Sequence, residues 1–218
     1  MAKTLIEQLI EKSIVSLTKK ELQGLTIIQD HALDACSNLT VLELPNTLTT
    51  IGKYSVEYCS SLTSITIPSS VTSLGQYCFS NCTSLVSATL PNSITTFEKN
   101  VFSGCSALTN VNIPTNITEL PASTFSDCSK LATITIPRNI GRIRDSAFKN
   151  TSAIANIYFN HSSSDSIILP TAGSSAGMFY RKTARSANVY TDNETVKNYA
   201  WATDNITATF YHLDGTAW

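Results

Sequence analysis

Apolar and polar residues recur along this chain with a period of 23 residues, and no gap or insertion interrupts the pattern over five repeats. The block from Cys59 to Asn81, CSSLTSITIPSSVTSLGQYCFSN, shows the frame. The same frame begins at each of five evenly spaced cysteines: Cys36, Cys59, Cys82, Cys105 and Cys128. A fixed period of this length predicts a solenoid, in which every repeat forms one coil and stacks on the coil before it.

Six apolar positions recur within each repeat, and they predict which side chains face the core. In the second repeat these positions are Leu62, Ile65, Ile67, Val71, Leu74 and Phe79. The segment L-x-x-I-x-I-P places its last two apolar residues on one face of a short strand, because side chains alternate between the two faces of a strand. One coil cannot bury these side chains alone, so the stack as a whole must form the core.

The full motif, C-x-x-L-x-x-I-x-I-P-x-x-V-x-x-I-G-x-x-A-F, resembles the BspA-like leucine-rich repeat, which is also called the Treponema pallidum type. The resemblance extends over residues 25–159. It implies a curved repeat solenoid with a parallel β-sheet on its concave face, and roles in adhesion and surface recognition, mostly in host-associated bacteria and some protists. Relatives also occur in phage and prophage genes, and the family supplies no catalytic residues to transfer to this chain.

Residues 1–24 lie outside the repeat and are predicted to form an N-terminal helical cap over the first coil. An apolar stripe at helix spacing consists of Leu5, Ile6, Leu9 and Ile10. Thr18 and Glu21 fit a capping box, which is a helix-start signal. An alternative is that this helix mediates docking or oligomerisation. The segment does not read as a signal peptide, because Glu7 and Glu11 interrupt the apolar stretch.

Residues 160–218 are predicted to form a mixed α/β C-terminal cap. Asn160 occupies the place of the repeat's proline, so the repeat register is expected to end there. Alternation and turn residues predict short strands at residues 167–169, 188–190 and 207–211. A short helix is expected to begin at Asp192 or Asn193 and to end near Ala202. This strand-then-helix ending resembles the closing segment of many BspA-like arrays.

Charged side chains make up only 14% of the chain, and the formal net charge is −1. This composition argues against nucleic-acid binding, which needs a basic surface that displaces counterions. It also argues against attraction to an anionic membrane surface. No apolar run approaches the length that crosses a membrane. We therefore expect neither a nucleic-acid partner nor membrane insertion.

The evenly spaced cysteines are predicted to form a column of buried thiols. Coils of a parallel stack lie ~4.8 Å apart, and a small apolar side chain suits a tight corner. Disulfides are less well supported, because five equal rungs leave one cysteine unpaired. Metal binding lacks support, because the chain has no C-x-x-C motif and only three histidines. We expect no metal and no cofactor.

One segment matches a catalytic motif. Residues 173–177 (GSSAG) fit the nucleophile motif G-x-S-x-G, and Asp192, Asp204 and His212 follow in the order found in α/β hydrolases. The context argues against this assignment. A nucleophile elbow joins a central strand directly to a helix, whereas residues 170–172 intervene here. A serine hydrolase is therefore only a distant alternative, and we expect no catalytic residues.

Two outward positions on each predicted strand form a candidate binding face. They lie five and seven residues after the cysteine, and in the four central repeats they are Ser64, Thr66, Ser87, Thr89, Asn110, Asn112, Thr133 and Thr135. Threonine suits strand geometry, so the row is compatible with a plain solvated sheet. It is equally compatible with a flat, uncharged surface that binds a glycan or a protein by hydrogen bonds. An ice-binding threonine array fits less well, because Val41, Glu43 and two asparagines interrupt it.

Together these features predict a non-enzymatic recognition or adhesion module. The expected partner is a protein or glycan on a cell or virion surface, and the N-terminal helix or the C-terminal cap is a candidate point of docking or homo-oligomer formation. No secretion or anchoring signal is recognised, so a virion-associated protein of a phage or prophage ranks first. An exported bacterial adhesin, held at the cell surface or secreted, is the alternative.

Overall fold

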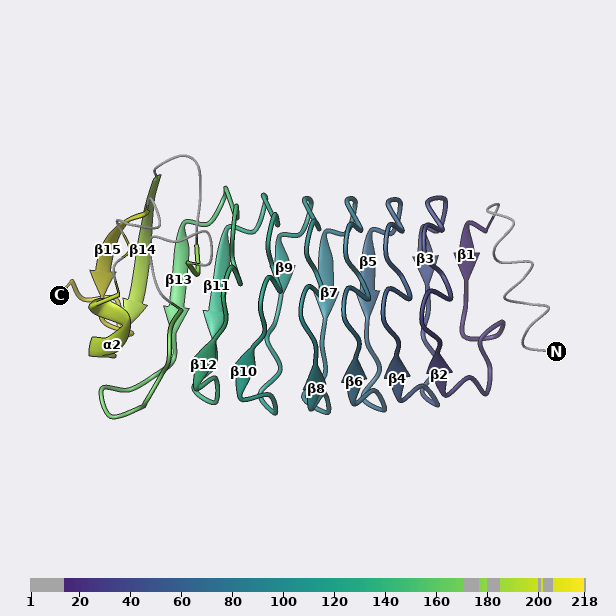
Figure 1. Cartoon of the computed structure of the whole chain (residues 1–218), viewed down its shortest axis with the longest axis horizontal. Helices are drawn as coiled ribbons and strands as arrows, with labels where there is room; N and C mark the ends of the chain where they lie inside the picture. The colour runs from purple at the N-terminus through teal and green to yellow at the C-terminus, as the bar shows by residue number, and fades with distance from the viewer. Residues whose placement is uncertain (1–13, 171–176, 180–184, 200, 202–205, 218) are drawn as a thin grey trace.

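The computed structural model describes residues 14–170, 177–179, 185–199, 201 and 206–217. Figure 1 shows an elongated stack in which the coils follow one another in sequence order along the long axis. Each central coil contributes one strand to each of two rows that run along the stack. The predicted parallel solenoid is confirmed.

The first row contains the strands that the L-x-x-I-x-I-P segment predicts in the repeats, together with β1 before them and β14 and β15 after them. Their bounds are β1 (Ser16–Leu17), β3 (Val41–Leu42), β5 (Ser64–Thr66), β7 (Ser87–Thr89), β9 (Asn110–Val111), β11 (Thr133–Ile136), β13 (Asn156–Phe159), β14 (Arg185–Thr191) and β15 (Ile206–Tyr211). Pairing is parallel, and in the central coils each residue lies opposite the residue one repeat later, as Ser64 does with Ser87. The exact period therefore fixes the register of this row.

The second row consists of two-residue strands, and each strand ends on a buried apolar residue, as β6 does on Leu74. Their bounds are β2 (Ile27–Ile28), β4 (Thr50–Ile51), β6 (Ser73–Leu74), β8 (Thr96–Phe97), β10 (Glu119–Leu120) and β12 (Arg142–Ile143). An isolated parallel bridge from Arg142 to Ile168 continues the row by one residue pair. The segment at residues 167–169, expected to be a strand, contributes only this bridge.

A single apolar core runs along the stack. The predicted inward positions of the second repeat are all buried. At the closing position of the repeat, the rings of Phe79, Phe102, Phe125 and Phe148 form a stacked column with successive centroid distances of 5.7, 5.9 and 5.6 Å. Phe179, which lies beyond the repeats, continues the column at 5.1 Å from Phe148. The stacked coils thus bury what a lone coil would expose, as the repeat pattern requires.

The predicted column of thiols is present inside the stack. Four of the evenly spaced cysteines, Cys59, Cys82, Cys105 and Cys128, are buried thiols whose Sγ–H donates to a main-chain carbonyl of the preceding coil. Cys59, for example, donates to the Leu33 oxygen at 3.2 Å. Burial raises the pKa of the Cys59 thiol to about 12. These thiols therefore satisfy the main chain at a tight corner and are poor nucleophiles.

The predicted N-terminal helix is wrong for the part of it that the structure describes. Ser16–Leu17 forms β1 and pairs in parallel with Val41–Leu42 of the first full coil. The capping box does form, because the Thr18 N–H donates to Glu21 Oε2 at 2.8 Å, but the chain continues as a turn. Pairing with the first coil outweighs the local helix signal. The apolar stripe at residues 5–10 lies outside the described residues.

The predicted C-terminal cap is not supported as a unit that closes the stack, although its expected strands at residues 188–190 and 207–211 are present within β14 and β15. The 23-residue spacing ends near Asn160 as expected, but β14 and β15 pair in parallel with β13 and extend the first row. The expected helix is present only as α2 (Glu194–Lys197), with Asn193 as its N-cap. The Asn193 side-chain oxygen accepts from the main-chain N–H groups of Thr195 and Val196, as a capping asparagine does. β14 and β15 thus continue the first row of the solenoid, and α2 lies between them in sequence.

Candidate binding face

The outward side chains of the first row lie on one side of the stack, and we call this surface the strand face. The eight residues singled out from the sequence all lie on it, between β5 and β11. Seven are exposed and Ser87 is half-buried. Ligand binding at these residues stays a prediction, but their placement on one surface follows directly from the alternation of each strand.

The strand face continues through the C-terminal strands, which sequence reasoning did not include. The column that contains Thr133 continues through Asn156, Asn188 and Thr209. The column that contains Thr135 continues through Tyr158, Tyr190 and Tyr211. A local signal for this continuation exists in the sequence: a polar residue, an apolar residue and a tyrosine recur as NIY, NVY and TFY.

Tyr158, Tyr190 and Tyr211 stack on one another, and we call them the tyrosine ladder. Centroids are 4.3 Å apart for Tyr158 and Tyr190, and 5.1 Å apart for Tyr190 and Tyr211. All three side chains are half-buried. Partial desolvation, with Tyr158 alongside, raises the pKa of the Tyr190 phenol. Because the rings cover each other's faces, the ladder presents ring edges and hydroxyl groups to solvent.

An amide pair accompanies the tyrosine ladder. Asn188 Nδ2 donates to Asn156 Oδ1 at 3.1 Å, across the pairing of β13 with β14. Each amide still has further donor or acceptor capacity, because an asparagine side chain carries two N–H groups and an oxygen with two lone pairs. The C-terminal part of the strand face thus combines aromatic edges with hydrogen-bonding groups and carries no charge in either column.

Asn112 differs from the other residues of the predicted face because its side chain bonds to the neighbouring coil. Its Oδ1 accepts from the Leu90 N–H at 2.9 Å, and its Nδ2 donates to the Leu90 carbonyl at 2.7 Å. One repeat earlier, the equivalent Ile67 N–H donates to the main-chain oxygen of Thr89. The Asn112 amide therefore replaces a ladder bond of the main chain, and its primary role is structural.

The strand face is divided where neighbouring strands do not pair. In the described part of the chain, β1 and β3 form one sheet, β5, β7 and β9 a second, and β11, β13, β14 and β15 a third. A groove marks each of the two breaks. Main-chain groups along an unpaired strand edge are available for hydrogen bonding, unlike those inside a paired ladder.

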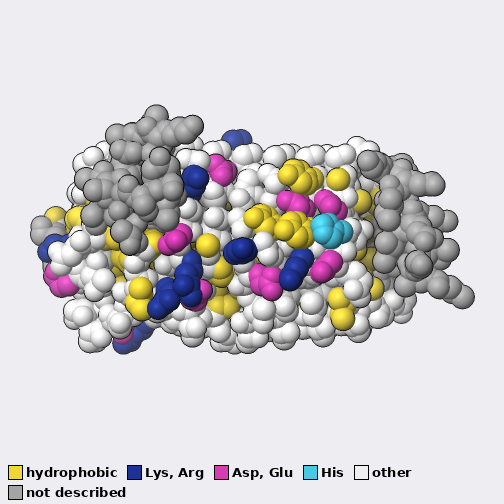
Figure 2. All heavy atoms as spheres, in the orientation of Figure 1, with side chains coloured by type: hydrophobic (Ala, Val, Ile, Leu, Met, Phe, Trp, Pro, Cys, Tyr) yellow, Lys and Arg dark blue, Asp and Glu magenta, His cyan; other side chains and the backbone are white. Residues whose placement is uncertain are grey.

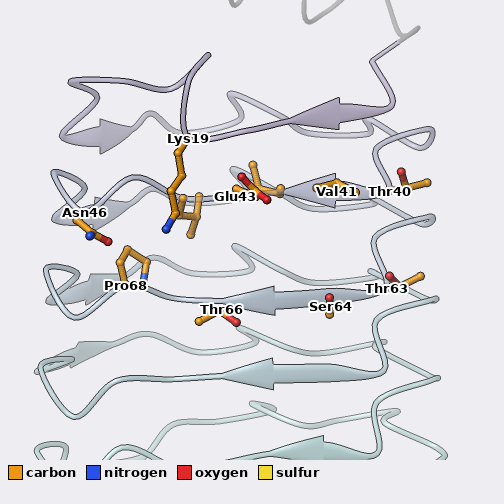
Figure 3. Close-up of a pocket in the computed structure, with 11 residues that line it drawn as sticks. Lys19, Thr40, Val41, Glu43, Asn46, Thr63, Ser64, Thr66 and Pro68 are labelled. Carbon is orange, nitrogen blue, oxygen red and sulfur yellow. The ribbon is translucent and has the colours of Figure 1, made fainter.

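The first groove, of about 480 Å³, lies at the break between β3 and β5. Figure 3 shows Val41 and Glu43 on the coil of β3, Thr66 on the coil of β5, and Lys19 reaching in from the coil before. Val41 is 43% exposed, an unusual state for a valine on a strand. The flanking lysine and glutamate make this groove the charged end of the strand face.

The second groove, of about 340 Å³, lies at the break between β9 and β11. Its walls come from residues 109–113 on one side and from Thr133, Thr135 and Pro137 on the other. Thr135 also lies directly opposite Tyr158 in the register of β11 with β13. The second groove and the tyrosine ladder are therefore neighbours on one surface.

A second stack of rings lies at a turn of the coils, away from the strand face. His31, Tyr54 and Tyr77 stack with centroid distances of 4.8 and 4.9 Å, and each has a positive φ. Nearby, burial raises the pKa of Glu57 against hydrogen bonds from Ser80 and Asn81 that lower it. Figure 2 shows a histidine surrounded by hydrophobic, acidic and Lys or Arg side chains, and further charged side chains extend along the same view of the molecule.

The hydrolase alternative gains no support from the described residues. His212 Nδ1 and Asp192 Oδ1 are 2.8 Å apart, but the same oxygen accepts from the Leu213 N–H at 3.3 Å. This pair fastens the end of β15 to β14. Ser175 and Asp204, the other members of the motif, lie outside the described residues.

The described residues hold neither a cluster suited to a metal ion nor a helix suited to crossing a membrane. No set of three or more histidine, cysteine, aspartate or glutamate side chains there is arranged to hold a metal ion. No helix among them has the length and apolar character needed to cross a membrane.

Several solved structures are similar to this chain. A crystal structure of a T. pallidum leucine-rich repeat protein matches 65% of this chain and 72% of its own, with 26% identity and a TM-score of 0.53. A leucine-rich cell surface protein from Faecalibacterium prausnitzii matches 73% of this chain and 63% of its own, with 19% identity and a TM-score of 0.39. A leucine-rich repeat protein from Bacteroides ovatus matches 91% of this chain and 78% of its own, with 18% identity and a TM-score of 0.36.

No curated protein matches the sequence. The family model of the BspA-type leucine-rich repeat region matches residues 26–155 in six copies, which is more than half of the chain. The predicted resemblance is thereby confirmed: this chain belongs to the BspA-type leucine-rich repeat family.

Proposed function

We propose that this chain is a recognition module that binds a macromolecule through its strand face. The observation that carries the proposal is the absence of charge in the outward columns of that face beyond β3. From Ser64 to Tyr211, neither outward column holds a charged side chain. Interfaces between macromolecules are depleted of charge at their centre, because a buried charge without a partner is costly. A long surface of hydroxyl, amide and phenol groups suits an uncharged, hydrogen-bonding ligand.

The proposal can be tested by placing charges on the strand face. Thr66→Lys, Thr89→Lys and Thr135→Lys together put three ammonium groups on exposed strand positions without touching the core. A matched control places lysines at Gln29, Thr83 and Thr118, which are also exposed but lie off the outward columns. Both triple variants should fold, because exposed substitutions usually change stability by less than ~0.5 kcal/mol each.

Binding is then measured with two defined probes, an array of neutral glycans and a library of random peptides displayed on phage. We expect the wild type and the control variant to bind the same members of one probe set, and the strand-face variant to lose them. Equal binding by all three proteins would refute the proposal.

We also propose that the module works outside the producing cell, on a phage or prophage virion or at a bacterial surface. An uncharged face that is open along the length of the stack suits contact with large partners in either place. The two locations predict that the protein is recovered in different fractions of a culture. Mass spectrometry should find the protein in purified phage particles in the first case, and in the cell-envelope or secreted fraction in the second. Recovery only from the soluble interior of the cell would contradict both.

A further inference from the structure

We propose that the tyrosine ladder and the second groove together form the main contact site of the strand face, and that the ligand of this site is a polypeptide with uncharged contact residues. The inference deepens the proposed function and rests on it, because it uses the same face. It adds a location, at β11 to β15 rather than at the four central repeats, and a chemical class of ligand.

The rigidity of the stacked tyrosines is the first reason to place the site at the tyrosine ladder. Association costs free energy for every side chain that must be immobilised, about 0.5–1.5 kcal/mol for a side chain with many rotamers. Tyr190 is held between the rings of Tyr158 and Tyr211, so little rotamer freedom remains to be lost. Rigid tyrosines that are apolar in body and polar at the tip dominate many protein interfaces.

Shape is the second reason. The second groove lies beside the ladder, separated from Tyr158 only by Thr135. Because β9 and β11 do not pair, unpaired strand edges border this groove. A hydrogen-bonding side chain of the ligand can enter the groove while the residues beside it pack against the ladder. Strong contact sites in interfaces combine such an anchor and pocket with a surrounding polar rim.

The orientation of the rings favours a polypeptide over a glycan. A sugar ring packs its C–H face on an open aromatic face, but in the ladder the faces of Tyr190 are covered by its neighbours. At Tyr190 only the ring edge and the hydroxyl group remain exposed, beside the amides of Asn156 and Asn188. Phenol and amide N–H groups can donate to main-chain carbonyls, and ring edges pack against aliphatic side chains.

The absence of charge at this site limits which polypeptides can bind there. The outward columns at this site offer no carboxylate, ammonium or guanidinium group between Thr133 and Tyr211. A ligand that buried a charged residue here would leave it without a counter-charge, which an interface centre tolerates poorly. The contact residues of the ligand are therefore expected to be apolar, hydroxyl-bearing or amide-bearing.

The test uses the full chain and a random peptide library displayed on phage. Peptides enriched on the wild type should be poor in charged residues, and Tyr190→Ser should weaken their binding about tenfold or more. Because Tyr190→Ser also unstacks the ladder, Thr135→Lys provides a second variant that changes the rim of the groove and leaves the rings in place. Tyr58→Ser is the matched control, since Tyr58 is 52% exposed at a turn off the strand face.

Three outcomes separate the inference from the proposed function. Loss of peptide binding in both Tyr190→Ser and Thr135→Lys, with Tyr58→Ser unchanged, supports the site. Binding of neutral glycans but not peptides, or peptide binding lost only on substitution at Thr66 and Thr89, overturns this inference and leaves the strand-face function standing. Ligand binding that is unchanged by every strand-face substitution overturns both this inference and the proposed strand-face function.

Discussion

Asn112 offers a sharp prediction, because its side chain makes two hydrogen bonds to the neighbouring coil, one of which replaces a main-chain bond of the repeat. Asn112→Ala removes the bonds to the Leu90 N–H and carbonyl, at 2.9 and 2.7 Å. A typical hydrogen bond contributes about 0.5–1.5 kcal/mol net, so the two together contribute about 1–3 kcal/mol. Asn112 itself is exposed, and water can partly replace the lost bonds. We therefore expect a loss near the lower half of that range, about 1–2 kcal/mol.

Asn110→Ala is the matched control on the same strand. Asn110 is exposed and belongs to the same strand face, and we expect its truncation to cost less than ~0.5 kcal/mol. Asn112→Asp is a second probe, because it retains an acceptor for the Leu90 N–H but places a carboxylate against the Leu90 carbonyl. It should be at least as destabilising as Asn112→Ala at neutral pH.

The assay is thermal and urea-induced unfolding, followed by circular dichroism. A loss of 1 kcal/mol lowers the Tm of a chain of this size by roughly 2–4 °C, so Asn112→Ala should lower it by roughly 2–8 °C. Equal melting temperatures for Asn112→Ala and Asn110→Ala would refute the assignment of a structural role to Asn112. Asn112 would then again be a candidate for direct contact with the ligand.

Three further predictions test the stack and its buried groups. Ile113→Asp should cost several kcal/mol because it buries a charge without a partner, whereas Thr66→Asp, on an exposed position, should cost under ~1 kcal/mol; equal shifts in Tm would contradict the inward and outward assignment. The Cys59 thiol, with a pKa raised to about 12 by burial, should react with iodoacetamide far more slowly in the native than in the unfolded protein, and fast native labelling seen by mass spectrometry would refute its burial. Burial raises the pKa of Glu57, so the folded state binds this proton more tightly than the unfolded state, and stability falls as the pH rises from the ordinary carboxyl pKa through the raised one. The Tm of Glu57→Gln, relative to that of the wild type, should therefore be higher at pH 7 than at pH 4, and a pH-independent difference would contradict this.

The repeat region was predictable from the sequence because its period is exact. Once the cysteines set the frame, side-chain alternation placed Ile65 in the core and Thr66 on the surface, and the structure agrees with both. The continuation of the sheet was not found in this way. Tyr158, Tyr190 and Tyr211 are spaced 32 and 21 residues apart instead of 23, so a search for the fixed period loses them.

Two other features, the turn near the N-terminus and the breaks in the first row, could not be predicted from the local sequence. Thr18 and Glu21 form the capping box that the sequence predicts, yet the strand before them pairs with the first full coil, and the chain turns instead of forming a helix. The breaks beside β3 and β11 lie between coils that share one motif, so the motif itself does not distinguish paired from unpaired neighbours.

Footprinting of the bound complex tests the central claim most directly. The wild-type protein, saturated with a peptide selected from the library, is exposed to hydroxyl radicals, and oxidation of each tyrosine is measured by mass spectrometry with and without the peptide. The account predicts protection of Tyr158, Tyr190 and Tyr211, and unchanged oxidation of Tyr58. Protection of Tyr58 with no change at the tyrosine ladder would contradict it.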